Sequence, residues 1–201
     1  AGIRELTVVT GYKANAVNFP GINTVDNPDY ETSGEVASLA CARDALNGEC
    51  IVSYGDIMFR NHILNQLLNC EADISLVIDA NWQQEREGTT KRTMDLAICT
   101  QGYTGDYFED ENAELTCLDP EASTESANGE WIGLAKFNQK GSQLLQAQLD
   151  RMEASGTLGS ASMIDLINRL IDDGAKPKVI YITGGWLDVN DAFDLARARN
   201  F

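Results

Sequence analysis

The chain has 201 residues, of which 43% are hydrophobic and 23% are charged, an ordinary composition for one globular domain. Its formal net charge of −16 argues against nucleic acids and anionic membranes as partners, because their phosphate groups would be repelled. Phosphate-bearing small molecules stay open, since a divalent metal held by carboxylates can invert the local charge.

The first part of the chain alternates between strand-like and helix-like segments. Apolar, β-branched runs that end at glycines or turns predict strands, and apolar residues at helical spacing predict helices. In chain order these are a buried strand at 6–10, a weaker strand at 23–26, a helix at 36–46 capped by Thr32 or Ser33, a strand at 50–54, a helix at 61–70 and a buried strand at 74–79.

The pattern changes between Gly88 and Asn128 and then resumes. Alternation at 94–98 predicts an antiparallel strand, and the acidic segment 106–125 is expected to be a solvated surface excursion. The remaining predicted elements are a strand at 131–137, helices at 139–155 and 162–173, a strand at 179–182 and a closing helix at 191–199.

This alternation of strands and helices implies an α/β fold with a mixed, mostly parallel sheet and helices on both faces. No internal repeat and no linker is visible, so a single domain over residues 1–201 is expected. No apolar run approaches the length of a membrane span, and the opening residues do not read as a signal peptide.

The cysteine and histidine content limits which disulfides, metal sites and catalytic groups the chain can form. The five cysteines are scattered without CxxC spacing, which favours reduced thiols in a cytoplasmic protein over a disulfide framework or a zinc site. His62 is the only histidine, so histidine-based triads and multi-histidine metal sites are excluded. It is expected to be a surface residue at the start of a helix.

Two aspartates stand just beyond predicted strands. Asp56 follows the strand at 50–54, and Asp188 follows the strand at 179–182 in a segment that leads into the last helix. In open parallel sheets ligands bind beyond the carboxyl ends of the strands. Because Mg²⁺ prefers one or two carboxylates together with phosphate oxygens and water, the pair would suit a metal-bound nucleoside triphosphate. Each aspartate could equally be a turn or helix-cap residue.

A succession of motifs carries a resemblance to a known family. The motifs, in family order, are LTVVTGYK at 6–13, Asn27-Pro28 with Tyr30, TSGE at 32–35 with Ser38-Leu39, YGD at 54–56, GEWIGLAKF at 129–137 and WLDVN at 186–190. Together they resemble the nucleotidyltransferase superfamily, and most closely the cytidylyltransferase domains associated with phosphoenolpyruvate phosphomutase in phosphonate biosynthesis. The resemblance implies a Rossmann-like three-layer α/β/α fold.

The resemblance also implies roles for individual residues. Asp56 and Asp188 are expected to be catalytic Mg²⁺ ligands, with Gly55 in the family's GD motif. Ser33, Gly34 and Ser38 match the segment that lies against the nucleobase, where close backbone approach favours glycine.

Two further residues are candidates for binding the acceptor. Glu130 matches the acidic position beside the acceptor, or is simply a strand-end carboxylate. Arg92, in the only adjacent basic pair, could hold a phosphonate through its guanidinium fork, or form a salt bridge at a strand end.

One part of the family pattern is absent from residues 1–201. Family members begin with a strand and a glycine-rich loop of the type LAAGxGxR, followed by a Pro-Lys pair that helps to hold the triphosphate. The chain is therefore expected to lack the N-terminal strand and phosphate loop, and to be inactive and prone to aggregate as it stands. A fragment completed by another segment is favoured over a degenerate relative, because Asp56 and Asp188 remain.

The resemblance implies Mg²⁺-dependent transfer of CMP from CTP to an aminoethyl- or hydroxyalkylphosphonate, with release of pyrophosphate. The chain would be fused to, or work beside, a phosphomutase, and it could form a homo-oligomer. A sugar-phosphate or phosphocholine nucleotidyltransferase is the alternative within the same enzyme class. A non-catalytic nucleotide-binding or interaction module is the alternative from another class.

Overall fold

The computed structural model describes residues 3–83 and 93–201. Contacts between residues divide the chain into two compact units, each made of two separate stretches of sequence. The first unit comprises residues 1–50 and 138–174, and the second comprises residues 51–137 and 175–201. The single-domain organisation stays a prediction.

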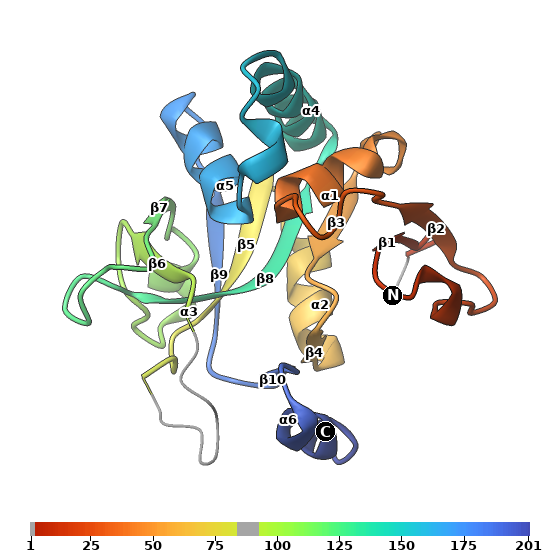
Figure 1. Cartoon of the computed structure of the whole chain (residues 1–201). Helices are drawn as coiled ribbons and strands as arrows, with labels where there is room; N and C mark the ends of the chain where they lie inside the picture. Colours follow the sequence, from red (N-terminus) through yellow and green to blue (C-terminus); the bar gives the residue numbers. More distant parts are fainter. Residues whose placement is uncertain (1–2, 84–92) are drawn as a thin grey trace. The chain divides into compact units, whose positions relative to one another are not determined.

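The first unit combines a short strand pair with helices (Figure 1). Its elements are β1 (Thr7–Thr10), β2 (Asn23–Asp26), α1 (Glu35–Cys41), α4 (Gln139–Ala154), α5 (Met163–Asp172) and short 3₁₀ turns at Ala14–Ala16, Arg43–Leu46 and Leu158–Ser160. β1 and β2 pair in parallel as a two-stranded sheet. Three of the four β1 residues are only partly buried, so the expectation of a buried strand here is wrong.

Helix starts in this unit follow capping chemistry. Asn138 Oδ1 accepts a hydrogen bond from Gly141 N (2.9 Å) at the start of α4. Ser162 and Asp165 form a reciprocal capping box at the start of α5, which matches the predicted start of that helix. The predicted cap of α1 is wrong, because Gly34 is the N-cap and no side chain caps this helix. The predicted helix at 36–46 is also shorter than expected: α1 ends at Cys41, and Arg43–Leu46 forms a 3₁₀ turn.

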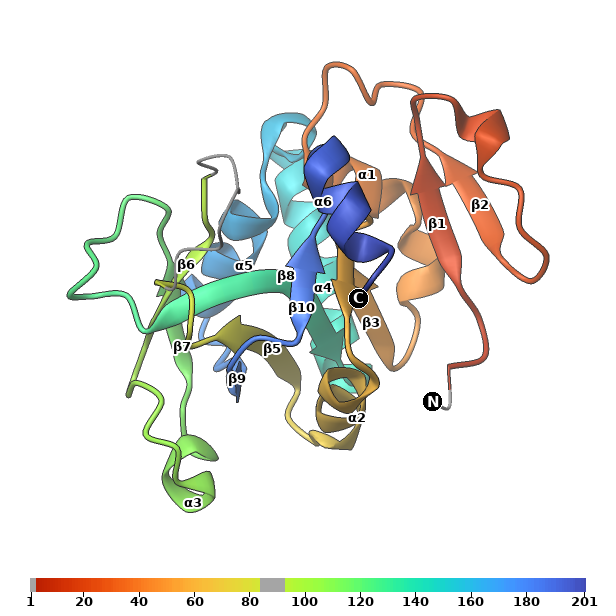
Figure 2. The same cartoon turned by 90° about the horizontal axis from the view of Figure 1, so that it is seen from below.

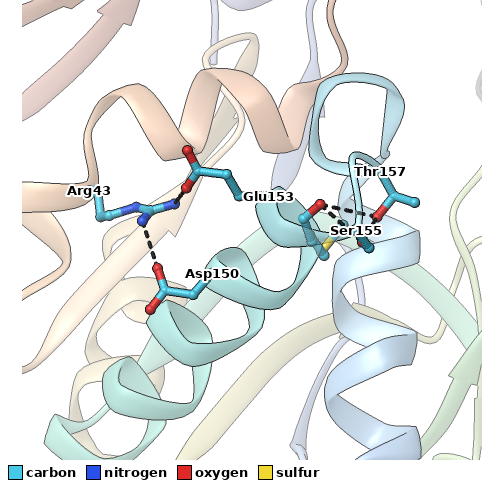
Figure 3. A network of polar contacts seen from close by, with 6 residues as sticks. Arg43, Asp150, Glu153, Ser155 and Thr157 are labelled. Atoms are coloured by element: carbon cyan, nitrogen blue, oxygen red, sulfur yellow. Dashed lines mark hydrogen bonds and ion pairs between the residues drawn. The ribbon is translucent and has the colours of Figure 1, made fainter.

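An ion-pair network joins this 3₁₀ turn to α4 (Figure 3). Arg43 donates from Nη1 to Asp150 (2.7 Å) and from Nη2 to Glu153 (3.0 Å), using both arms of its guanidinium. Both carboxylates are about two-thirds exposed, so water weakens the attraction. The network fixes the direction of Arg43 more than it adds stability.

The second unit is built on a mixed sheet. Within the described residues this sheet has six strands in the order β7-β6-β8-β5-β9, with β3 also paired to β8. The strands are β3 (Cys50–Ser53), β5 (Ile74–Asp79), β6 (Leu96–Cys99), β7 (Leu115–Leu118), β8 (Gly129–Phe137) and β9 (Lys178–Ile182). β5 pairs in parallel with β9 and antiparallel with β8, and β6 is antiparallel to both β7 and β8.

The remaining elements of this unit include the helices α2, α3 and α6 (Figure 2). They are β4 (Ile57–Phe59), α2 (Asn61–Asn69), α3 (Tyr107–Asp110), β10 (Trp186–Asp188) and α6 (Ala192–Ala198). α2 packs Ile63 and Leu67 onto a cluster that includes Val77, Leu134 and Ile182. Every residue of β5 and of β8 is buried, so these two strands form the centre of the sheet.

The segment 106–125 differs from the expected surface excursion. It contains β7, whose end residues Leu115 and Leu118 are buried, together with the buried Ala113. Acidic neighbours obscure this short apolar pattern in the sequence. No helix in residues 3–83 or 93–201 is both long and apolar enough to cross a membrane.

Candidate functional site

The two aspartates singled out from the sequence meet at a small antiparallel ladder in the second unit. β4 pairs with β10, with Asp188 opposite Ile57. One residue further along, Val189 N donates to Asp56 O (2.9 Å). The backbones of Asp56 and Asp188 therefore lie at the same end of this ladder, although 131 other residues separate them in sequence.

The position of Asp56 is fixed through the residues before it. Tyr54 N donates to Gly133 O (2.9 Å), and the Tyr54 ring lies against Gly133 so closely that a Cβ at that glycine would overlap it. Gly133 also has a φ of +78°, which disfavours any other residue. Tyr54 OH donates to Asp95 Oδ2 (3.2 Å), and its ring packs beside Trp131. These contacts hold the chain just before the Gly55-Asp56 turn.

The position of Asp188 depends on a third aspartate at a strand end. Asp79, the last residue of β5, is 1% exposed and accepts hydrogen bonds from Trp186 Nε1 (2.6 Å) and Gly184 N (3.0 Å). These bonds attach the start of β10 to the end of β5. Beyond the ladder, Asn190 Nδ2 donates to Asp188 Oδ2 (2.7 Å). Asp188 is thus held from both sides.

The residues expected to lie against a nucleobase belong to the first unit. Asn27 is 3% exposed, and its Nδ2 donates to Ser33 Oγ and Ser38 Oγ, both at 3.0 Å. Its Oδ1 accepts from Asp29 N (3.0 Å). Asn27 therefore fixes both hydroxyls, and Ser33 stands one residue before Gly34, the N-cap of α1.

The two glycines of the predicted site differ in what surrounds them. A Cβ at Gly34 would collide with Ala161 O, and Gly34 N donates to Gly159 O (2.8 Å). The close approach that requires glycine there is thus to the chain's own backbone. A Cβ at Gly55 would meet nothing within 4 Å, so space around Gly55 is open.

Of the two candidate acceptor residues, only Glu130 lies within the described residues. It is 2% exposed in β8, directly opposite Asp79 of β5 and next to Leu96 of β6 in the ladder. This burial shows that Glu130 is not a solvated carboxylate, although it stands near the start of β8. Arg92 lies outside the described residues.

A pocket of about 270 Å³ opens in the second unit at the end of β9. His62 and Gln66 of α2 line it, as do Tyr103, Tyr181 and the Thr183-Gly184-Gly185 segment. The rings of Tyr103 and Tyr181 lie 5.8 Å apart between centroids, tilted by 55°. His62 is exposed, as expected for a surface residue at a helix start, and it also lines this pocket.

Burial changes the acidity of groups beneath the pocket. It raises the pKa of Tyr181, and the neighbouring Cys99 raises it further. Burial also raises the pKa of Cys99 to about 11. Tyr181 OH donates to Gln101 O (2.7 Å), so the phenol serves as a neutral hydrogen-bond donor at neutral pH.

The donor set near Asp56 and Asp188 suits Mg²⁺ better than a transition metal. Among the described residues, no group of three or more His, Cys, Asp or Glu side chains is arranged to hold a metal ion. The backbones of the two aspartates meet at one ladder end, and carboxylate oxygens are ligands that Mg²⁺ takes together with phosphate oxygens and water. These oxygen donors are of the chemical type that an ion arriving with a triphosphate would require.

Sequence reasoning missed Asn27 and Asp79 as site residues. Asp79 carries the same signal as Asp56, a carboxylate at the end of a strand-like run, and could have been found by that rule. Asn27 looks like an ordinary turn residue before Pro28, and only its long-range partners reveal its role.

No family model matches the chain. One curated protein, the CTP:phosphoglutamine cytidylyltransferase of Campylobacter jejuni subsp. jejuni, is 24% identical over 215 residues, which covers 97% of this chain and 81% of that protein.

Solved structures agree with the fold. The inositol-1-phosphate CTP transferase from T. maritima has a TM-score of 0.68 at 13% identity, covering 96% of this chain and 73% of that one. The CTP:phosphocholine cytidylyltransferase from Streptococcus pneumoniae has a TM-score of 0.65 at 14% identity, covering 99% and 78%. A putative glucose-1-phosphate thymidylyltransferase from Bacillus anthracis has a TM-score of 0.68 at 14% identity, covering 98% and 76%. The chain therefore has the α/β fold seen in nucleotidyltransferases, as the sequence resemblance predicted.

Proposed function

We propose that this protein transfers a nucleotidyl group, CMP from CTP, to a small acceptor that carries a phosphate or phosphonate. The observation that supports this most directly is the β4–β10 ladder, in which the Val189 N to Asp56 O bond brings Asp56 and Asp188 to one end. The fold and the cytidylyltransferase relative agree with it.

The reaction needs positioning and charge neutralisation more than proton transfer. An acceptor oxygen attacks the α-phosphorus of CTP and forms a new P–O bond. The bond from the α-phosphorus to the bridging oxygen breaks, and pyrophosphate leaves with the electron pair. A phosphate or phosphonate dianion is already a competent nucleophile, so no general base is required.

The chain's own residues would divide this work. Asp56 and Asp188 would hold Mg²⁺, which when bound would offset the negative charge of the triphosphate and of the leaving pyrophosphate. Asp79 would position Asp188 by attaching β10 to β5. Ser33, Gly34 and Ser38, with hydroxyls oriented by Asn27, would form the turn that reads the base. Glu130 and Arg92 are proposed to face the acceptor.

A phosphonate acceptor and an association with a phosphomutase are the finer form of this proposal, and they rest on the sequence resemblance. Sugar 1-phosphates and phosphocholine are the competing acceptors. The deciding assay is pyrophosphate release by the full-length protein with Mg²⁺, each nucleoside triphosphate, and a panel of aminoethylphosphonate, hydroxyalkylphosphonates, phosphocholine and hexose 1-phosphates. Turnover with hexose 1-phosphates alone would overturn the phosphonate assignment. Absence of turnover with every pair would favour a non-catalytic module.

The metal assignment has its own test. Asp56→Asn and Asp188→Asn should each lower kcat/KM by at least a hundredfold, because losing one carboxylate from the ion site costs about 3 kcal/mol or more of transition-state stabilisation. Asp172→Asn, an exposed change at the end of α5, serves as the matched control and should leave turnover unchanged. Near-normal turnover in both variants would overturn the assignment.

A further inference from the structure

The pocket at the end of β9 is lined by uncharged groups that can form hydrogen bonds. His62 and Gln66 stand four residues apart on α2, so an imidazole and a carboxamide lie side by side on one helix face. The phenols of Tyr103 and Tyr181 and the hydroxyl of Thr183 supply further polar groups next to aromatic surface. No Asp, Glu, Lys or Arg of the described chain lines the pocket.

A pair of glycines keeps this pocket open. Gly184 and Gly185 have φ values of +90° and +81°, a conformation that residues with a Cβ rarely adopt. A Cβ at Gly184 would meet nothing within 4 Å, so the space beside it is open. A Cβ at Gly185 would lie 3.3 Å from Cε1 of His62, which shows how closely the imidazole approaches this backbone.

The pocket is also close to the candidate metal site in sequence and in space. Asp188 comes three residues after Gly185, along β10. Three extended residues span at most about 10 Å between Cα atoms. Arg60 N donates to Gly185 O (2.9 Å) at one end of the β4–β10 ladder, and Val189 N donates to Asp56 O at the other. One short ladder therefore connects the pocket to the two aspartates.

We infer that this pocket is the acceptor subsite, and that it selects acceptors whose far end is uncharged and hydrogen-bonding, such as a hydroxyl or a carboxamide. This inference rests on the proposed nucleotidyl transfer. An acceptor with its phosphorus near Asp188 places its other end within reach of the pocket. An ammonium group would lose hydration there without gaining a carboxylate partner from the described residues that line the pocket, which makes a cationic tail unfavourable.

Three probes of equal length separate the possible tails. Isothermal titration of the full-length protein with 3-hydroxypropylphosphonate, 3-aminopropylphosphonate and butylphosphonate compares a hydroxyl, an ammonium and a methyl end. The hydroxyl probe should bind at least tenfold more tightly than the other two. If the ammonium probe binds as tightly as the hydroxyl probe or more tightly, the proposed selectivity against cationic tails is wrong. If the methyl probe binds as tightly as the hydroxyl probe, the polar side chains that line the pocket do not contribute to binding.

A single substitution on α2 then tests whether the probe binds in this pocket. Gln66→Leu should raise KM for 3-hydroxypropylphosphonate at least tenfold, while kcat and KM for CTP change less than twofold. It should also weaken binding of that probe in the titration. Asn65→Leu, a change of the neighbouring exposed amide that does not line the pocket, should do neither. Circular dichroism checks that both variants keep their helices.

The outcomes separate the two proposals. If the full-length protein turns over the acceptor and Gln66→Leu leaves its KM unchanged, the pocket assignment is wrong and nucleotidyl transfer stands. If no acceptor is turned over but Gln66→Leu still weakens probe binding, nucleotidyl transfer fails and the pocket remains a binding site. Binding that is equal in wild type and Gln66→Leu overturns the inference in either case.

Discussion

Asn27 shows how one buried side chain can organise a whole turn. Its amide nitrogen bonds two hydroxyls, and its carbonyl oxygen bonds a backbone N–H two residues on. Asn27→Ala should lower the free energy of unfolding by about 1–3 kcal/mol, because it removes three hydrogen bonds made by a buried side chain. Urea denaturation measures this. Asn15→Ala, an exposed change in a 3₁₀ turn, should cost less than about 0.5 kcal/mol, the usual limit for surface changes. Equal costs for the two variants would contradict the role given to Asn27.

At this scale the sequence was informative where a residue's role is local. The motifs around Asp56 and Asp188 predicted that both stand beyond strands, and the structure brings their backbones to one ladder. The role of Asn27 depends on residues up to 11 positions away, and that of Asp79 on residues more than 100 positions away. The strand-end position of Asp79 is visible in the sequence, but the hydrogen-bond partners of both residues follow from folding and not from any local pattern.

The helix α2 is held at its end by a buried lysine. Lys136 is 3% exposed on β8, and its Nζ donates to Leu68 O (2.9 Å) and Cys70 O (2.8 Å), carbonyls at the C-terminal end of α2. A cation at this end is favoured by the helix dipole. Lys136→Met keeps the aliphatic stem and removes both bonds, and it should cost about 2–3 kcal/mol of unfolding free energy.

Thermal or urea unfolding tests this prediction, with Lys176→Met as the matched control. Lys176 is 75% exposed, and its ion pair with Glu114 is 3.8 Å long, so its replacement should cost less than about 1 kcal/mol. If Lys136→Met is no more destabilising than Lys176→Met, then α2 does not depend on this bond for its position beside the sheet.

Elements with a strong apolar pattern were predicted well, and short ones were not. Every residue of β5 and of β8 is buried, and the runs of apolar residues in these segments predict strands. β4 and β10 have three residues each, which is too short for any alternation to be visible. Yet this pair carries the candidate site. Four-residue β7 was hidden by acidic flanks, although its end residues reach the core.

Across the whole chain, burial predicts very unequal local stability. β5 and β8 are buried along their full length, whereas β1 and β2 form an isolated two-stranded ladder with mostly accessible residues. Two-stranded sheets are marginal by themselves. Native-state hydrogen exchange followed by mass spectrometry should therefore find the slowest amides in residues 74–79 and 129–137, and exchange at least a hundredfold faster in residues 7–10 and 23–26. Comparable protection of all four segments would contradict this order.

Gly34 lies so close to the carbonyl of Ala161 that the loops containing these two residues in the first unit have to move together. Neither can shift inward without displacing the other, because no side chain lies between them to absorb the movement. If residues 32–38 read the base as proposed, a new base preference would call for compensating changes in residues 157–161, and mutations in the two loops should be epistatic.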